Sequence, residues 1–145
     1  MFDSISRLFS RPETSGFRND PKLAVAALLV HLAGVDGTVD DAEKQAVRGA
    51  LQDFYGMDED AVRELIREAR RSDAEAVDLY RFTSVIKELD EKERIEIIRM
   101  MWQVVFADSK NHELEDNMVW RVAELIGVSA RDRTILRKQM ARGNS

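Results

Sequence analysis

The sequence contains no cysteine, and its 145 residues include only two prolines and seven glycines. Without cysteine the chain can form no disulfide, no thiolate nucleophile, no cysteine-ligated zinc site and no iron–sulfur cluster. This composition is compatible with a reducing compartment, so we expect a cytoplasmic protein. The scarcity of proline and glycine favours long helices over many tight turns.

Long apolar runs are also missing, and none reaches the roughly 18–20 residues that would span a bilayer. We therefore expect no integral membrane segment. Residues 1–9 lack the continuous apolar core of a signal peptide, but they place Phe2, Ile5, Leu8 and Phe9 on one side of a short helix. This helix either caps the domain or frays, or it anchors the chain to a membrane surface or a partner.

Positive charge is in deficit, because 22 basic side chains face 27 acidic ones and the net charge is −5. This balance argues against binding to nucleic acid. No motif marks an activated nucleophile or a phosphate-binding glycine loop, and the two histidines do not form an obvious pair. We therefore predict that the protein is not an enzyme.

Apolar residues recur at helical spacing along the chain, and no segment alternates with period two. We predict an all-α fold, a single compact bundle of about seven helices at residues 22–142, after a short N-terminal helix and linker at residues 1–21. The segment from Lys22 to about Val35 is apolar almost all round, so it should lie at the centre of the core. The helices are predicted at about 22–35, 40–55, 58–71, 74–88, 91–108, 113–126 and 130–141.

The chain also repeats itself with a shift of 72 residues, which relates Asp36 to Asp108 and Glu43 to Glu115. The acidic pair keeps its spacing in both copies and lies at the same helix–loop–helix junction. Apolar positions coincide as well, as in Leu28 with Met100, Leu29 with Met101, Leu32 with Val104, Val47 with Val119, Ala50 with Val122 and Phe54 with Ile126. We predict two units related by a pseudo-twofold axis, at about 22–71 and 91–142, joined by a linking helix at about 74–89.

The repeated acids have two interpretations. Glu43 can complete a capping box with Asp40, and Glu115 suits the positive end of a helix dipole. Asp36 and Asp108 fit this interpretation less well, because each follows an apolar helix whose C-terminal dipole disfavours an anion by roughly 0.3–1 kcal/mol. If the two loops face each other, four carboxylates would repel unless a cation compensates them.

Oxygen ligands of this kind favour Ca²⁺, Mg²⁺ or Mn²⁺. His112 occupies the position equivalent to Asp40. It would add a nitrogen donor that suits Mn²⁺ or Zn²⁺ if it is a ligand, and otherwise it caps a helix; Zn²⁺ is the less favoured metal. The loop is not an EF-hand, because Asp36 is followed directly by Gly37 and the further ligands of that motif are absent.

Charge is separated along the chain. Residues 36–60 carry eight acids and two bases, whereas residues 129–145 carry five bases and one acid. The basic terminal helix is either a solvated face or a docking surface for an acidic partner, including another copy of the chain. Trp102 and Trp120 are expected in the core, although Trp120 corresponds to the polar Arg48 in the first copy.

The two acidic loops resemble those of the TerB-like family, a tellurite-resistance-associated all-helical domain. The motif runs Val35-Asp36-Gly37-Thr38-Val39 to Glu43 in the first copy and Ala107-Asp108 to Glu115 in the second. Residues 116–128, which follow the second copy, look like the uncharacterised branch of that family rather than the tellurite-operon protein. The second copy departs from the motif, because Ser109 replaces glycine and Asn111 replaces an apolar residue.

This resemblance, which covers about residues 22–142, implies a metal site formed by Asp36, Glu43, Asp108 and Glu115, and a link to tellurite or general stress responses. We therefore expect a non-enzymatic TerB-like module that binds a divalent metal ion between its acidic loops. The alternative is a metal-free interaction module that docks a protein partner, or a second copy, through the acidic loops or the basic C-terminal helix.

Overall fold

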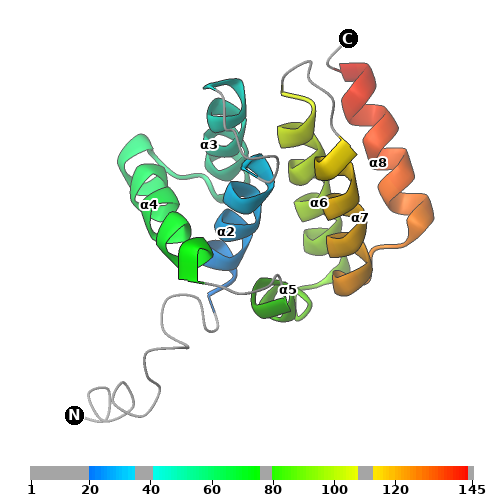
Figure 1. Cartoon of the computed structure of the whole chain (residues 1–145), viewed down its shortest axis with the longest axis horizontal. Helices are drawn as coiled ribbons and strands as arrows, with labels where there is room; N and C mark the ends of the chain where they lie inside the picture. The colour runs from blue at the N-terminus through cyan, green and yellow to red at the C-terminus, as the bar shows by residue number, and fades with distance from the viewer. Residues whose placement is uncertain (1–19, 35–40, 76–79, 108–112, 144–145) are drawn as a thin grey trace.

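The computed structural model describes residues 20–34, 41–75, 80–107 and 113–143, and these residues form seven α-helices and no strand (Figure 1). The all-α prediction is therefore confirmed. The helix predicted over residues 1–9 lies outside the described residues. The helices are α2 (Pro21–Ala33), α3 (Asp41–Tyr55), α4 (Glu59–Glu75), α5 (Tyr80–Ile86), α6 (Glu91–Val105), α7 (Glu113–Ile126) and α8 (Ala130–Gly143).

Helix α2 forms the centre of the core, as its apolar sequence predicts. Asp20 caps its first turn by accepting hydrogen bonds from the backbone N–H groups of Lys22 and Leu23, and Pro21 starts the helix. Every side chain from Leu23 to Leu29 is buried. The helix packs against α3, α4, α5, α6 and α7, so it has no solvated face that would need polar residues.

Two groups of three helices lie on either side of α5. In the first, α2, α3 and α4 pack pairwise, and in the second α6, α7 and α8 do the same. Figure 1 shows that α2 and α6 run towards the same side of the molecule and that α3 and α7 return from it. Helix α3 also packs on α6 as α7 packs on α2. These contacts agree with the predicted repeat, whose twofold relation stays a prediction.

The residues that follow α3 and α7 also correspond between the two copies of the repeat, but at a slightly different shift. Each helix is followed by a glycine with a positive φ, Gly56 at 63° and Gly127 at 83°. The next helices are capped by Asp58 and Ser129, each of which accepts a hydrogen bond from the backbone N–H three residues further on. A shift of 71 residues relates these positions, so the second copy is one residue shorter at this turn.

The boundary predicted between the third and fourth helices is wrong. A break was expected at Ser72–Asp73, but α4 continues to Glu75 and α5 begins only at Tyr80. Serine and aspartate are weaker helix formers than alanine by only about 0.5 kcal/mol each, and good helix formers follow them at Ala74 and Glu75. A helix that already packs on α2 can therefore continue through this pair.

Replacing Gly127 with alanine should lower the free energy of unfolding by about 2 kcal/mol. A Cβ at this position would strain the left-handed backbone and would lie 3.0 Å from Nη1 of Arg94. That nitrogen donates a hydrogen bond to the carbonyl of Ile126, the last residue of α7, over 2.8 Å. Urea denaturation followed by circular dichroism measures the loss.

Gly56→Ala is the matched control, because a Cβ there would meet no atom within 4 Å. Its cost should be the backbone strain alone, about 1 kcal/mol. Equal losses in the two variants would show that the contact of Arg94 with the end of α7 contributes nothing.

Candidate functional site

Two of the four predicted metal ligands, Glu43 and Glu115, fall within the described residues. Asp36 and Asp108 lie outside them, as does His112. Glu43 is the third residue of α3, and Glu115 is the third residue of α7. The structure therefore places both glutamates in the first turn of a helix.

Both glutamates are almost completely buried. The exposed fraction is 1% for Glu43 and 2% for Glu115, and both take part in further interactions within the chain. A glutamate that only completes a capping box lies on the surface, whereas charged side chains are almost never fully buried unless they are compensated. The positive end of the helix dipole helps each carboxylate by about 0.3–1 kcal/mol, which is small beside the several kcal/mol that burying an ion costs.

The described residues contain no group of three or more histidine, cysteine, aspartate or glutamate side chains that could hold a metal ion. The chemistry of the two buried glutamates fits a hard cation, because both present carboxylate oxygens. A complete coordination sphere would need further ligands, and the sequence offers Asp36 and Asp108 shortly before α3 and α7.

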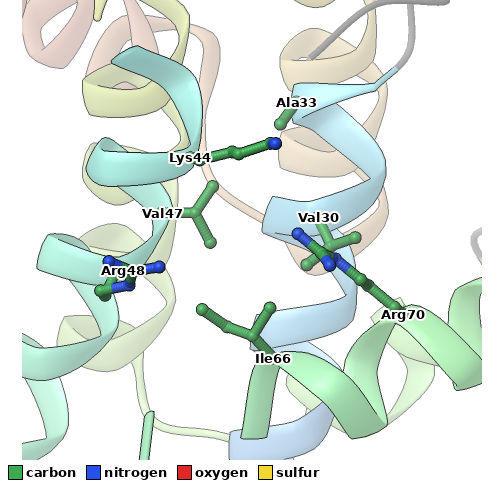
Figure 2. Close-up of a pocket in the computed structure, with 7 residues that line it drawn as sticks. All are labelled: Val30, Ala33, Lys44, Val47, Arg48, Ile66 and Arg70. Carbon is green, nitrogen blue, oxygen red and sulfur yellow. The ribbon is translucent and has the colours of Figure 1, made fainter. Parts of the chain in front are cut away.

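A separate pocket opens between α2, α3 and α4, with a volume of about 360 Å³. Figure 2 shows Lys44 and Arg48 reaching its edge from α3 and Arg70 from α4. Among the described residues, apolar side chains also line the pocket, namely Val30 and Ala33 of α2, Val47 of α3 and Ile66 of α4. The pocket thus combines a small apolar wall with a cationic rim.

This pocket could not be predicted from the sequence, although the sequence contains one signal for it. Lys44 and Arg48 are the two bases among the eight acids of residues 36–60, and their spacing of four places them on one side of a helix. Arg70 could not be joined to them, because the crossing of α4 over α2 and α3 is not visible in the sequence.

The basic terminal helix is less available for docking than its composition suggests. Arg133 is only 5% exposed, and Arg137 forms an ion pair with Asp116 of α7 over 2.8 Å. The guanidinium of Arg133 covers the ring of Trp120 at 3.7 Å from its centroid. Two of the five bases in residues 129–145 are therefore used within the molecule.

Residues 22–138 match the sequence model of a known family, described as Tellurite resistance protein TerB. The chain belongs to the TerB family. No curated protein and no solved structure matches it significantly. The match covers all seven described helices except the start of α2 and the last residues of α8, so the helical bundle as a whole is the TerB module.

The TerB module is thus a helical module of a tellurite-resistance-associated family. Among its described helices none has the length and apolar character needed to cross a membrane.

Tyr55 lies near the start of α2, where the ammonium of Lys22 lies over its ring at 5.5 Å from the centroid. Burial raises the pKa of its hydroxyl far above the usual value, and the nearby charges of Glu93 and Asp20 add to this shift. The phenol is therefore protonated at neutral pH and is unsuited to act as a general base.

Proposed function

We propose that this TerB module is a non-enzymatic, cytoplasmic protein that binds a divalent metal ion through Glu43 and Glu115, together with Asp36 and Asp108, in a response to tellurite or to general stress. The observation that carries the proposal is the near-complete burial of two carboxylates at corresponding positions of α3 and α7. The proposed ion is Ca²⁺, Mg²⁺ or Mn²⁺, with Zn²⁺ less favoured because no cysteine is present.

The proposed role of the ion follows from where these glutamates lie. Each sits in the first turn of a helix that follows an acidic loop, and α3 and α7 belong to different halves of the bundle. An ion shared by the two halves would offset the cost of burying both carboxylates and would hold the loops in one arrangement. Metal binding would stabilise one form of the module. The stability of the module would therefore depend on the concentration of divalent ions in the cell.

Metal ions should raise the melting temperature of the wild-type protein. A ligand at 100 times its Kd stabilises the folded state by about 2.7 kcal/mol, which corresponds to roughly 5–10 °C for a chain of this size. Thermal denaturation of the metal-free protein with added Ca²⁺, Mg²⁺, Mn²⁺ or Zn²⁺ measures the shift. Calorimetric titration of the same ions gives the affinity.

The double variant Glu43→Gln, Glu115→Gln should lose this shift, since an amide is neutral and a much weaker ligand. Asp41→Asn is the matched control, because Asp41 lies in the same first turn of α3 but is exposed. The proposal is wrong if no ion shifts the wild-type protein, or if the double variant and the control respond alike.

The metal-free alternative makes a different prediction. A module that docks a partner or a second copy through its acidic loops should keep its stability in chelator and should associate in a salt-sensitive way. Docking through the basic terminal helix is the weaker form of this alternative, because Arg133 and Arg137 already bind within the molecule. Light scattering after gel filtration would detect a second copy.

A further inference from the structure

The pocket between α2, α3 and α4 has three cationic side chains in its lining. They are Lys44, Arg48 and Arg70, and among the side chains that the structure describes no acid forms an ion pair with any of them. The chain as a whole has a net charge of −5, so the three cations at this pocket are opposite in sign to the net charge of the protein. Like charges gathered at one rim repel each other, and an anion between them would relieve that repulsion.

The shape of the pocket matches an anion with an apolar part. In Figure 2 the ammonium of Lys44 extends from α3 towards Ala33 on α2, and the side chain of Arg70 reaches from α4 towards α2. The side chains of Val47, from α3, and Ile66, from α4, give the same pocket an apolar surface. Guanidinium groups bind carboxylate and phosphate groups through paired N–H donors, while an apolar wall favours a carbon skeleton.

The predicted repeat relates residues of this pocket to a cluster of side chains in the second half of the bundle. The 72-residue shift relates Val30 to Trp102 and Lys44 to Asp116, and the 71-residue shift beyond the helix-ending glycines relates Ile66 to Arg137. Their second-half counterparts form a compact cluster. The carboxylate of Asp116 binds Arg137 at 2.8 Å, and Arg137 lies 5.3 Å from the centroid of the fully buried Trp102.

The two halves therefore have different side chains at these corresponding positions. The second half has an indole ring there and supplies its own carboxylate for the cation. The first half has the aliphatic residues Val30 and Ile66 in place of the indole and the arginine, and Lys44 in place of the carboxylate. Relative to the second half, the first half lacks the bulk of the indole and the carboxylate, and its cations come from positions other than that of Arg137.

We infer that the pocket between α2, α3 and α4 binds a small organic anion, with a phosphate or carboxylate group held by Lys44, Arg48 and Arg70 and an apolar body against Val30, Val47 and Ile66. The volume of about 360 Å³ lies within the range of small-molecule pockets. This site differs from the proposed metal site, because neither Glu43 nor Glu115 is among the described residues that line it.

Calorimetric titration of the full chain in metal-free buffer tests the inference. The probes are phenyl phosphate and benzoate, which carry both parts, together with inorganic phosphate and benzyl alcohol, which carry one part each. At least one of the two complete probes should bind roughly tenfold or more tightly than inorganic phosphate and benzyl alcohol. Its affinity should fall with added salt, because the rim is open to solvent. If inorganic phosphate binds as tightly as phenyl phosphate, the apolar part of the inference is wrong.

The double variant Arg48→Gln, Arg70→Gln should weaken binding of the better probe roughly tenfold or more. Arg71→Gln is the matched control, because Arg71 is exposed on α4 next to Arg70 but does not line the pocket. Val30→Trp places the residue of the second half at the equivalent position, so it should fill the pocket and abolish binding. Circular dichroism confirms the fold of each variant.

The inference is overturned if neither phenyl phosphate nor benzoate binds, or if the double variant binds as well as Arg71→Gln. A loss of stability in the double variant without a loss of binding would also overturn it, because the cations would then serve the fold. The metal-site variant Glu43→Gln, Glu115→Gln should keep the anion affinity, which separates a failure of this inference from a failure of the proposed metal site.

Discussion

Replacing Trp102 with alanine should lower the free energy of unfolding by about 3–5 kcal/mol, which is a large part of the 5–15 kcal/mol that typically stabilises a domain. Trp102 is fully buried in α6, and its Nε1–H donates a hydrogen bond to the backbone carbonyl of Arg133 over 3.2 Å. Its ring lies 6.1 Å from that of Phe106 and 5.3 Å from the guanidinium of Arg137. The truncation removes this packing and leaves a cavity between α6 and α8.

Chemical denaturation followed by far-ultraviolet circular dichroism measures the loss, since the substitution removes a fluorophore. Trp102→Phe should cost less than half as much, because it keeps most of the apolar volume and loses mainly the hydrogen bond, about 1 kcal/mol. Trp120→Ala serves as the second control, because Trp120 is 38% exposed. A loss in Trp102→Ala no larger than in Trp120→Ala would contradict the view that this indole closes the second half of the bundle.

The central helix and the turn glycines are the features that could be predicted best from the sequence. The apolar run after Asp20–Pro21 admits no orientation other than a buried one, so the place of α2 followed from composition alone. The bounds of α7 agree with those predicted, because acids crowd its first turn and Gly127 ends it. Local signals suffice where a cap, a periodic face and a stop all agree.

Sequence reasoning was weaker where side chains from separate helices meet. Arg133 was counted with the exposed bases, but it is buried because Trp120 on α7 offers both a ring face and a carbonyl acceptor. The cationic pocket depends on how α4 crosses α2 and α3. Helical periodicity gives the face of each helix but not the angle at which two faces meet, so neither feature could be derived from spacing.

The two glutamates of the proposed metal site, Glu43 and Glu115, could be predicted only in part from the sequence. The repeat identified Glu43 and Glu115 as equivalent, and the structure adds that both are buried. That burial could not be predicted, because the spacing from Asp40 to Glu43 fits an exposed capping box equally well. The distinction matters for function, since only a buried carboxylate needs compensation by a cation or a hydrogen-bond network.

Arg133→Ala should lower the free energy of unfolding by about 2–4 kcal/mol. The side chain is 5% exposed and donates a hydrogen bond from Nη1 to the carbonyl of Trp120 over 3.1 Å, while its guanidinium covers the indole at 3.7 Å. Its ion pair with Glu124 is long, 3.7 Å, and that carboxylate is 73% exposed, so it contributes little. Truncation should therefore uncover the ring of Trp120.

Two readouts test this. Urea denaturation gives the stability, and acrylamide quenching of tryptophan fluorescence should increase in the variant, because Trp120 loses its cover while Trp102 stays buried. Arg131→Ala is the matched control, because Arg131 is exposed on the same helix and should change stability by about 0.5 kcal/mol or less. Arg133→Met keeps the length of the side chain without its charge, so it separates packing from the cation.

Arg133→Met should recover part of the loss but not all of it. Methionine can lie against the indole, but it cannot donate to the carbonyl of Trp120 or attract the ring electrostatically. If Arg133→Met is as stable as the wild type, the arginine acts only by its bulk. If Arg133→Ala behaves like Arg131→Ala, the guanidinium does not hold α8 on α7, and Arg133 would return to the set of bases available to a partner.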